Sequence, residues 1–363
     1  MRRKAMAAAL ALAVLLGGAA ARADEAGLDK AVADERRGDY ASALAAFERL
    51  AGADPEAAYW VGALYEKGEG VPQDLAAAAR WYARAADRGF PAAAFRLGLL
   101  LDTGQGVPQD RAGALRLYLA AAQKGHLAAM RAIGLAYESG NGVERNEKAA
   151  FSWYRRAADH GDNEAFNRAR RLALAMTGDA GLSPVDTAFA EMQRGDQMRA
   201  LGALLDAAEA GDAEAKAWLG YFYENGFAGP KDFAKAARYY QEAAAGGSAK
   251  GMTDYATALL YGPGVPHDPA AARRLLAAAA AAGFALAQFN LAYLEEQDAK
   301  GGEAALAAAR RWYRSAGLLG YQPAWQELGR LLGEPAPKPA RPPAPQSPAS
   351  QPLAAGTTPP AAQ

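Results

Sequence analysis

The chain of 363 residues contains no cysteine. This absence excludes disulfide bonds, thiolate metal sites and a cysteine nucleophile. It also excludes the lipid-modified cysteine that anchors bacterial lipoproteins. A folded chain of this composition has to be stable through packing alone.

Residues suited to catalysis are also scarce. The chain has three histidines, His126, His160 and His267, and none stands at metal-ligand spacing from a second ligand. No G-x-S-x-G elbow, S-x-x-K pair or phosphate-binding loop occurs. Carboxylates are abundant, but sequence alone does not place two of them in one cleft. We therefore expect a non-enzyme with no catalytic residue, no metal and no cofactor.

An excess of positive charge is missing as well. Forty lysines and arginines balance forty aspartates and glutamates over the whole chain. Binding to the phosphates of a nucleic acid requires a basic face. We therefore expect no nucleic-acid partner.

An apolar run near the N-terminus, residues 5–16, is too short to span a bilayer. It follows Arg2-Arg3-Lys4 and precedes Ala21-Arg22-Ala23, which is the order of a secretory signal peptide. We predict cleavage after Ala23, no membrane span in the mature chain, and a periplasmic or secreted location. Cleavage would remove four basic residues and leave a net charge of −4.

A 36-residue period dominates the chain before residue 163, which is typical of a repeat protein. Four registers share it over three units: Gly62, Gly98 and Gly134; Gly68, Gly104 and Gly140; Tyr82, Tyr118 and Tyr154; and Gly89, Gly125 and Gly161.

Each unit has the pattern of two helices. In the first unit, apolar residues at helical spacing predict helices over about 55–67 and 75–88. Gly68 suits the left-handed position that ends the first helix, and Asp74 suits the N-cap of the second. Gly62, in the middle of a helix, indicates close helix–helix contact, which we expect with Ala85-Ala86.

The turn "GVPQD" occurs at residues 70–74 and 106–110, with "GVPHD" at 264–268. Its composition favours a structural turn that caps the second helix, and a ligand-binding loop is the alternative. The glycines of this turn lack the spacing of a dinucleotide-binding fingerprint. They also follow a helix, whereas that fingerprint follows a strand.

The pattern A-x-Y-x-x-G-x-x-Y-x-x-G-x-G-V-P-x-D, followed by A-x-x-W-Y-x-x-A-A-x-x-G, resembles Sel1-like repeats, a branch of the tetratricopeptide superfamily. The first unit matches it from Ala57 to Gly89. The resemblance implies an all-α fold, a right-handed α/α solenoid whose first helices line a concave face. It also implies binding of proteins or peptides, since exported relatives often regulate or assemble envelope machinery.

The array appears twice. "RGDYASALAAFERLA" at 37–51 is matched by "RGDQMRALGALLDAA" at 194–208, and Trp60 by Trp218. We predict a signal peptide at 1–23, a first half at 24–176, a linker at 177–184, a more degenerate second half at 185–333 and a disordered tail at 334–363. Lone helices over 163–176 and 323–332 would close each half. The proline-rich tail is read as a passive spacer, and a peptide ligand or a tether that associates with the cell wall is the alternative.

Aromatic pairs recur on the second helices. They are interpreted either as the core between stacked repeats or as a stripe of rings that binds sugars.

Better candidates for partner binding are first-helix positions that change identity between repeats. One row is Trp60, Arg96, Ala132, Trp218, Asp254 and Asn290, and tryptophan is a common interface anchor. The second row is Glu66, Asp102, Glu138 and Glu224, acids at helix C-terminal ends, which the helix dipole disfavours. Either neighbouring arginines or a cationic partner would offset them.

These observations predict an interaction scaffold of the cell envelope that binds a protein or peptide on its concave face. The alternative is a wall- or glycan-binding protein, or one that interacts with β-lactams. Relatives of that second kind carry a disulfide in each repeat, and this chain has none. Stacking of the array on a second copy is a third hypothesis, which the lone helices disfavour.

Overall fold

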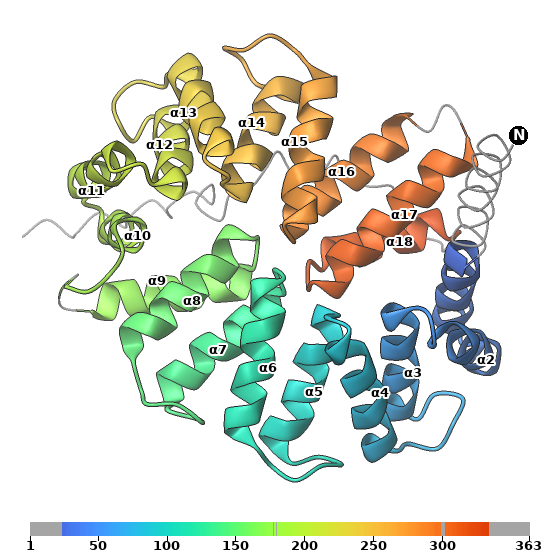
Figure 1. The fold of residues 1–363 in the computed structure, drawn as a ribbon. Coiled ribbons are helices and arrows are strands. Elements are labelled where there is room, and N and C mark those ends of the chain that lie inside the picture. The colour runs from blue at the N-terminus through green and yellow to red at the C-terminus, as the bar shows by residue number, and fades with distance from the viewer. Residues whose placement is uncertain (1–23, 177, 179, 299–301, 334–363) are drawn as a thin grey trace, which may run out of the picture. The chain divides into compact units, whose positions relative to one another are not determined.

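The computed structural model describes residues 24–176, 178, 180–298 and 302–333 (Figure 1). These residues form helices and connecting turns, with no strand among them. Consecutive helices pair antiparallel, so the expected all-α repeat solenoid is confirmed. The predicted signal peptide and the tail from 334 lie outside the described residues, and the predicted halves stay a prediction. The chain separates into two compact units, one ending at Ala121 and the other beginning at Ala122.

The first unit begins with a helical segment over residues 24–36. It continues with α2 (Tyr40–Leu50), α3 (Pro55–Lys67), α4 (Leu75–Asp87), α5 (Pro91–Thr103) and α6 (Arg111–Gln123), whose last two residues belong to the second unit. Helix α3 packs on α4, and α4 on α5. The α3/α4 pair buries Tyr82 with several alanines, Val61 and Leu64, and the α5/α6 pair buries Tyr118 with several alanines and Leu100.

The second unit continues the same arrangement (Figure 1). Its helices are α7 (Leu127–Ser139), α8 (Glu147–Asp159), α9 (Asn163–Ala175), α10 (Pro184–Arg194), α11 (Gln197–Glu209), α12 (Ala213–Asn225), α13 (Phe233–Ala245), α14 (Ala249–Tyr261), α15 (Pro269–Ala281), α16 (Ala285–Gln297), α17 (Glu303–Leu318) and α18 (Pro323–Leu331). The two lone helices expected near 163 and 323 are α9 and α18.

The "GVPQD" turn has the predicted structural role. Gly68 ends α3 in the left-handed conformation, with φ of 75°, and Asp74 accepts a hydrogen bond from the backbone N–H of Ala77 at 2.8 Å. The Gln73 side chain donates to the carbonyl of Glu66 at 2.8 Å and so satisfies a carbonyl at the end of α3. Gln109 repeats this bond to Asp102 at 2.7 Å.

The mid-helix glycines do mark close packing, but the expected partner was wrong. A methyl group on Gly62 would lie 2.8 Å from the ring of Tyr82 and 3.3 Å from the carbonyl oxygen of Ala78, so neither Ala85 nor Ala86 is the neighbour. The tyrosine is wholly buried, and its Cδ1 and Cε1 atoms lie against the glycine. Gly98 with Tyr118, Gly134 with Tyr154 and Gly220 with Tyr240 repeat the contact.

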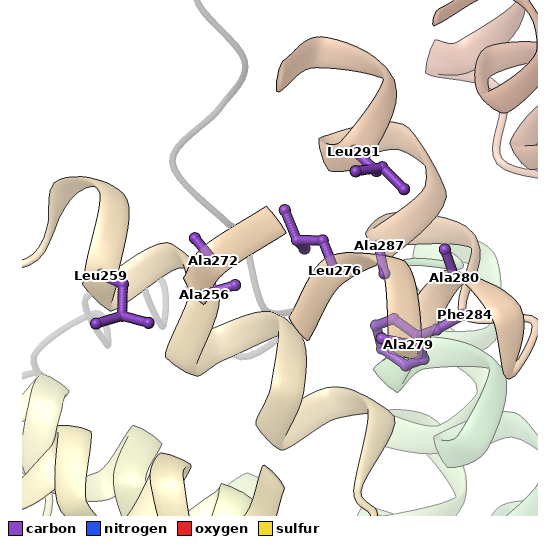
Figure 2. Close-up of a cluster of buried hydrophobic side chains, with 9 residues drawn as sticks. All are labelled: Ala256, Leu259, Ala272, Leu276, Ala279, Ala280, Phe284, Ala287 and Leu291. Carbon is purple, nitrogen blue, oxygen red and sulfur yellow. The ribbon is translucent and has the colours of Figure 1, made fainter. Parts of the chain in front are cut away.

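The repeat formed by α14 and α15 replaces this contact by an aliphatic one (Figure 2). Ala256 occupies the glycine register and Leu276 the tyrosine register, and both are buried in one cluster with Leu259 and Leu291. The smaller, flexible leucine leaves room for the alanine methyl. The degeneracy of this repeat in sequence is therefore a change of packing within an unchanged helix pair.

Candidate functional site

The acidic row predicted for partner contact lies against the buried tyrosines. Each glutamate, one residue before the end of its first helix, accepts a hydrogen bond from the tyrosine of its own repeat. The pairs are Tyr82 to Glu66 at 2.5 Å, Tyr154 to Glu138 at 2.8 Å, Tyr240 to Glu224 at 2.6 Å and, in the last repeat, Tyr313 to Glu296 at 3.2 Å. Burial and the neighbouring carboxylate raise the pKa of Tyr82, so its hydroxyl stays a donor.

Arginines from the second helix further along the chain neutralise several of these acids. Arg96 donates through Nε to Glu66 at 3.0 Å, and Arg171 donates to Glu138 at 2.6 Å. Arg330 binds Glu296 in the same way. A neighbouring arginine thus offsets Glu66, Glu138 and Glu296, and the role of the acidic row in partner contact stays a prediction.

Asp102 departs from this arrangement. The hydroxyl of Tyr118 is buried and has no hydrogen-bond partner among the described residues. Aspartate is one methylene shorter than glutamate, and Asp102 lies 3.9 Å from the Nε of Arg111 instead. Burial raises the pKa of Tyr118, and the Asp102 charge adds to the rise.

The two tryptophans of the other predicted row are largely covered. Trp60 is 7% exposed, stacks on Phe47 with ring centroids 5.8 Å apart, and donates from its indole N–H to Glu56 at 3.3 Å. Trp218 is 1% exposed and makes edge contacts with Phe189 and Tyr221. Little of either ring remains for a partner, and their binding role stays a prediction.

Three predicted residues of the second unit come together around one lysine. Lys250 is buried, binds Asp254 at 2.9 Å, and lies over the ring of Trp218 at 5.7 Å from its centroid. Glu224 lies near Asp254, and burial, with the Asp254 charge adding, raises the pKa of Glu224. Asp254 thus places a carboxylate at the register where the repeat of α5 and α6 has the guanidinium of Arg96.

A cavity of about 480 Å³ opens beside this lysine, between the C-terminal end of α8 and the N-terminal ends of α12 and α14. We call it the α8–α12–α14 cavity. Its apolar walls include Met130, Trp153 and Phe284, and its charged lining consists of Arg156, Asp159, Asp212, Glu214 and Lys250.

A buried ion cluster forms the floor of this region. The guanidinium of Arg155, 3% exposed, binds Asp159, Asp186 and Glu214, the last at 2.7 Å. It joins α8 to the first turns of α10 and α12, and Ser152 also donates to Asp186 at 2.7 Å. Burial raises the pKa of Asp159 to about 7, although the Arg155 charge opposes the rise.

His160 lies at the same end of α8. Its ring is 4.3 Å from that of Phe284, and its Nδ1 is buried with no hydrogen-bond partner among the described residues. Burial lowers the pKa of His160 to about 4, so the imidazole is neutral at pH 7. His160 therefore lines the cavity together with Asp159 and Glu214, and its Nδ1 is buried without a hydrogen-bond partner among the described residues.

Sequence reasoning missed this site, although a signal was present. The register of Arg155 holds Ala83 and Leu119 in the two preceding repeats. A charge where the other repeats have an apolar residue predicts a specific buried partner. The partners Asp186 and Glu214 lie 31 and 59 residues further along the chain, where no repeat register points to them.

Among the residues that the structure describes, no group of three His, Cys, Asp or Glu side chains is placed to hold a metal ion. None of the described helices is long and apolar enough to cross a membrane.

Comparison with known families finds the Sel1 repeat model at residues 55–90, 91–126, 127–162, 213–248, 249–284 and 285–321. The chain belongs to the Sel1 repeat family. The six Sel1 repeats coincide with the helix pairs α3/α4, α5/α6, α7/α8, α12/α13, α14/α15 and α16/α17. The resemblance inferred from the repeat pattern is confirmed.

Solved structures include similar proteins. A Sel1 repeat protein from Oxalobacter formigenes is 29% identical, with 70% of this chain and 96% of that one covered and a TM-score of 0.39. A protective antigen of uropathogenic Escherichia coli strains, displaying an SLR fold, is 28% identical over 90% and 76%, with a TM-score of 0.41. An immunity protein from Pseudomonas aeruginosa is 19% identical over 63% and 82%, with a TM-score of 0.28. No curated protein matches the chain.

Proposed function

We propose that this Sel1 repeat scaffold is a non-enzymatic protein of the bacterial cell envelope that binds a protein or peptide partner in the α8–α12–α14 cavity. The observation that carries the proposal is the cavity itself, which is large enough for several side-chain atoms and is bounded by repeats tied to one another. The envelope location rests on the secretory pattern of residues 1–23.

The lining favours a basic side chain of the partner. Asp159, Asp212 and Glu214 face the cavity with Arg156 and Lys250, and Lys250 is already bound by Asp254. Arg155 already binds Asp159 and Glu214, but the side chain of Glu214 remains 43% exposed and so accessible. Trp153 and Phe284 provide apolar and aromatic surface for the methylenes of a lysine or arginine.

The repeats offer a matched control. Trp153 lies under the guanidinium of Arg156, at 5.1 Å, and Trp81 lies under Arg84 at 4.6 Å in the first repeat. Trp81 belongs to the first unit and is not part of the cavity lining. Both variants, Trp153→Ala and Trp81→Ala, therefore remove a tryptophan that lies under an arginine, but only Trp153→Ala removes a residue of the cavity lining.

The test is crosslinking capture from intact cells with the full-length chain, Trp153→Ala and Trp81→Ala as baits, after circular dichroism has shown equal helicity. We expect an envelope protein that is captured by the parental chain and by Trp81→Ala but is reduced at least tenfold with Trp153→Ala. Equal capture by all three baits would remove the cavity from the proposal. Fractionation and mass spectrometry of the N-terminus test the envelope location, with mature protein expected to begin at Asp24.

A further inference from the structure

A second cavity, about 430 Å³ in volume, lies where α7 and α9 meet α16 and α18. We call it the α7–α16 cavity. Its lining comes in pairs of residues 158 or 159 positions apart, the offset of the internal duplication: Ala128 with Leu286, Arg131 with Phe289, Gly161 with Gly320, Asp162 with Tyr321, Asn163 with Gln322 and Glu164 with Pro323. Equivalent positions of the third and sixth Sel1 repeats thus face each other.

Backbone contacts between the repeats form one end of this cavity. The N–H of Leu127 donates to the carbonyl of Leu319 at 2.8 Å. Gly125 and Gly283, also an equivalent pair, have φ of 84° and 83°; a methyl group on Gly125 would overlap the carbonyl of Gly283, and one on Gly283 would overlap the carbonyl of Lys124. The walls are therefore held by the main chain.

The two sides differ in chemistry although their positions correspond. On one side Arg131 binds Asp162 and Glu164; Glu164 also pairs with Arg168 at 3.2 Å, and its side chain remains 55% exposed. On the other side Phe289 and Tyr321 meet edge to face, with ring centroids 5.2 Å apart. The cavity has an acidic rim facing an aromatic wall.

Three side-chain amides complete the lining. Asn163 and Gln322 are exposed, Asn290 is half-buried, and none of the three hydrogen-bonds through its side chain within the described part of the chain. An amide offers two N–H donors and one acceptor. These groups are available to the backbone of a peptide.

This combination fits a proline-rich segment. A polyproline II strand has no internal hydrogen bonds, so its carbonyls accept from side-chain donors while its rings pack on aromatic walls. We propose that the α7–α16 cavity binds residues 335–345 of this chain, "PAPKPARPPAP". Lys338 and Arg341 of this segment complement the acidic rim at Glu164.

The distance along the chain permits this occupant. Helix α18 begins at the cavity with Pro323 and ends at Leu331; its nine residues correspond to about 13 Å at the α-helical rise. An extended proline-rich strand advances about 3.1 Å per residue. Fewer than ten residues therefore suffice to return from the end of α18 to the cavity.

The absence of native cysteine allows a direct test in the full-length chain. Asn167→Cys, exposed on α9 one turn beyond Asn163, and Ala340→Cys would carry nitroxide spin labels for a pulsed electron paramagnetic resonance distance measurement. We expect a narrow, short distance component. A broad distribution in this otherwise unaltered chain would overturn the proposal.

Two perturbations identify the site. Asn163→Ala with Gln322→Ala removes amides that make no internal hydrogen bond, so folding should be unchanged, and we expect loss of the narrow component. An excess of the synthetic peptide 334–346 should also remove it, whereas the same peptide with alanine in place of proline should not. Persistence of the narrow component under both perturbations would place the tail elsewhere and overturn this site.

Discussion

The buried hydroxyl of Tyr118 has no hydrogen-bond acceptor among the described residues, although Asp102 occupies the register at which glutamates of other Sel1 repeats accept a hydrogen bond from the tyrosine of their own repeat. Exchange of Asp102 for glutamate should supply the missing hydrogen bond. We expect Asp102→Glu to raise the free energy of unfolding in urea by about 1 kcal/mol, because a buried donor without a partner becomes satisfied.

The tyrosines themselves provide the control. Tyr118→Phe removes an unsatisfied hydroxyl and should change stability by less than about 0.5 kcal/mol, whereas Tyr82→Phe breaks a bond to a carboxylate and should cost about 1.5–3 kcal/mol. In the Tyr118→Phe background, Asp102→Glu should give no gain. An equal gain in both backgrounds would show that the added methylene acts through packing.

The contact between Gly62 and Tyr82 leads to a sign reversal in a double-mutant cycle. Gly62→Ala improves helix propensity by about 1 kcal/mol but overpacks the tyrosine ring, which costs about 1–3 kcal/mol, so we expect net destabilisation. With Tyr82→Leu, the same alanine should stabilise the protein relative to Tyr82→Leu alone. Unfolding in urea measures all four corners of the cycle.

The repeat of α14 and α15 is a natural precedent for the Tyr82→Leu background. Its Ala256 lies opposite Leu276, and Leu260 takes the place of the glutamate. Glycine, tyrosine and acid are all replaced in this repeat, whereas the repeat of α16 and α17 has Ala292 in the glycine register and keeps the hydrogen bond from Tyr313 to Glu296. If Gly62→Ala destabilises both backgrounds equally, the glycine is needed for a reason other than the ring.

The helices and their turns could be predicted from sequence because their causes are local. Gly68 and Asp74 act on backbone groups within a few residues, so their spacing is enough to place a helix end and a helix start. The mid-helix glycine was more difficult. Its spacing indicated a close neighbour, but whether Tyr82 or Ala85 supplies it depends on the rotation of one helix against the other.

The acid row shows where sequence reasoning reached its limit. The position of Glu66 near a helix C-terminal end indicated that it needs a cation, and the structure provides Arg96 from 30 residues further on. Its second partner, Tyr82, was not foreseen. The Arg155 cluster joins three helices across 59 residues of sequence, and such contacts follow from tertiary packing rather than from any periodic pattern.

Arg155 should be among the side chains whose loss is most costly. Arg155→Met would leave Asp159 and Asp186 buried without their cation, and we expect a loss of about 3–5 kcal/mol in the free energy of unfolding. The neighbouring Arg156 is exposed over Trp153, so Arg156→Met should cost less than about 1 kcal/mol.

The pH dependence of that loss tests its cause. Buried carboxylates without a cation have a raised folded-state pKa, so the stability deficit of Arg155→Met should shrink at pH 5 and grow at pH 8. Unfolding curves at both values measure it. A deficit that does not change with pH would mean that lost packing, and not uncompensated charge, is responsible.

His160 should make the protein sensitive to acid. Burial lowers its folded-state pKa to about 4 from an ordinary value of 6.5, so between these values the unfolded chain binds the additional proton. Stability from this residue is therefore present above pH 6.5 and is lost as pH falls toward 4. The loss between pH 8 and pH 5 should be about 2 kcal/mol.

The variant His160→Phe keeps a ring against Phe284 and removes the titration. The raised pKa of Asp159 acts in the opposite direction over the same range, but it is present in both proteins and largely cancels in their difference. We expect His160→Phe to gain about 2 kcal/mol relative to the parental chain between pH 8 and pH 5. A nuclear magnetic resonance titration checks the cause directly, since a His160 midpoint near 6.5 would contradict a desolvated ring and require solvent to reach its Nδ1.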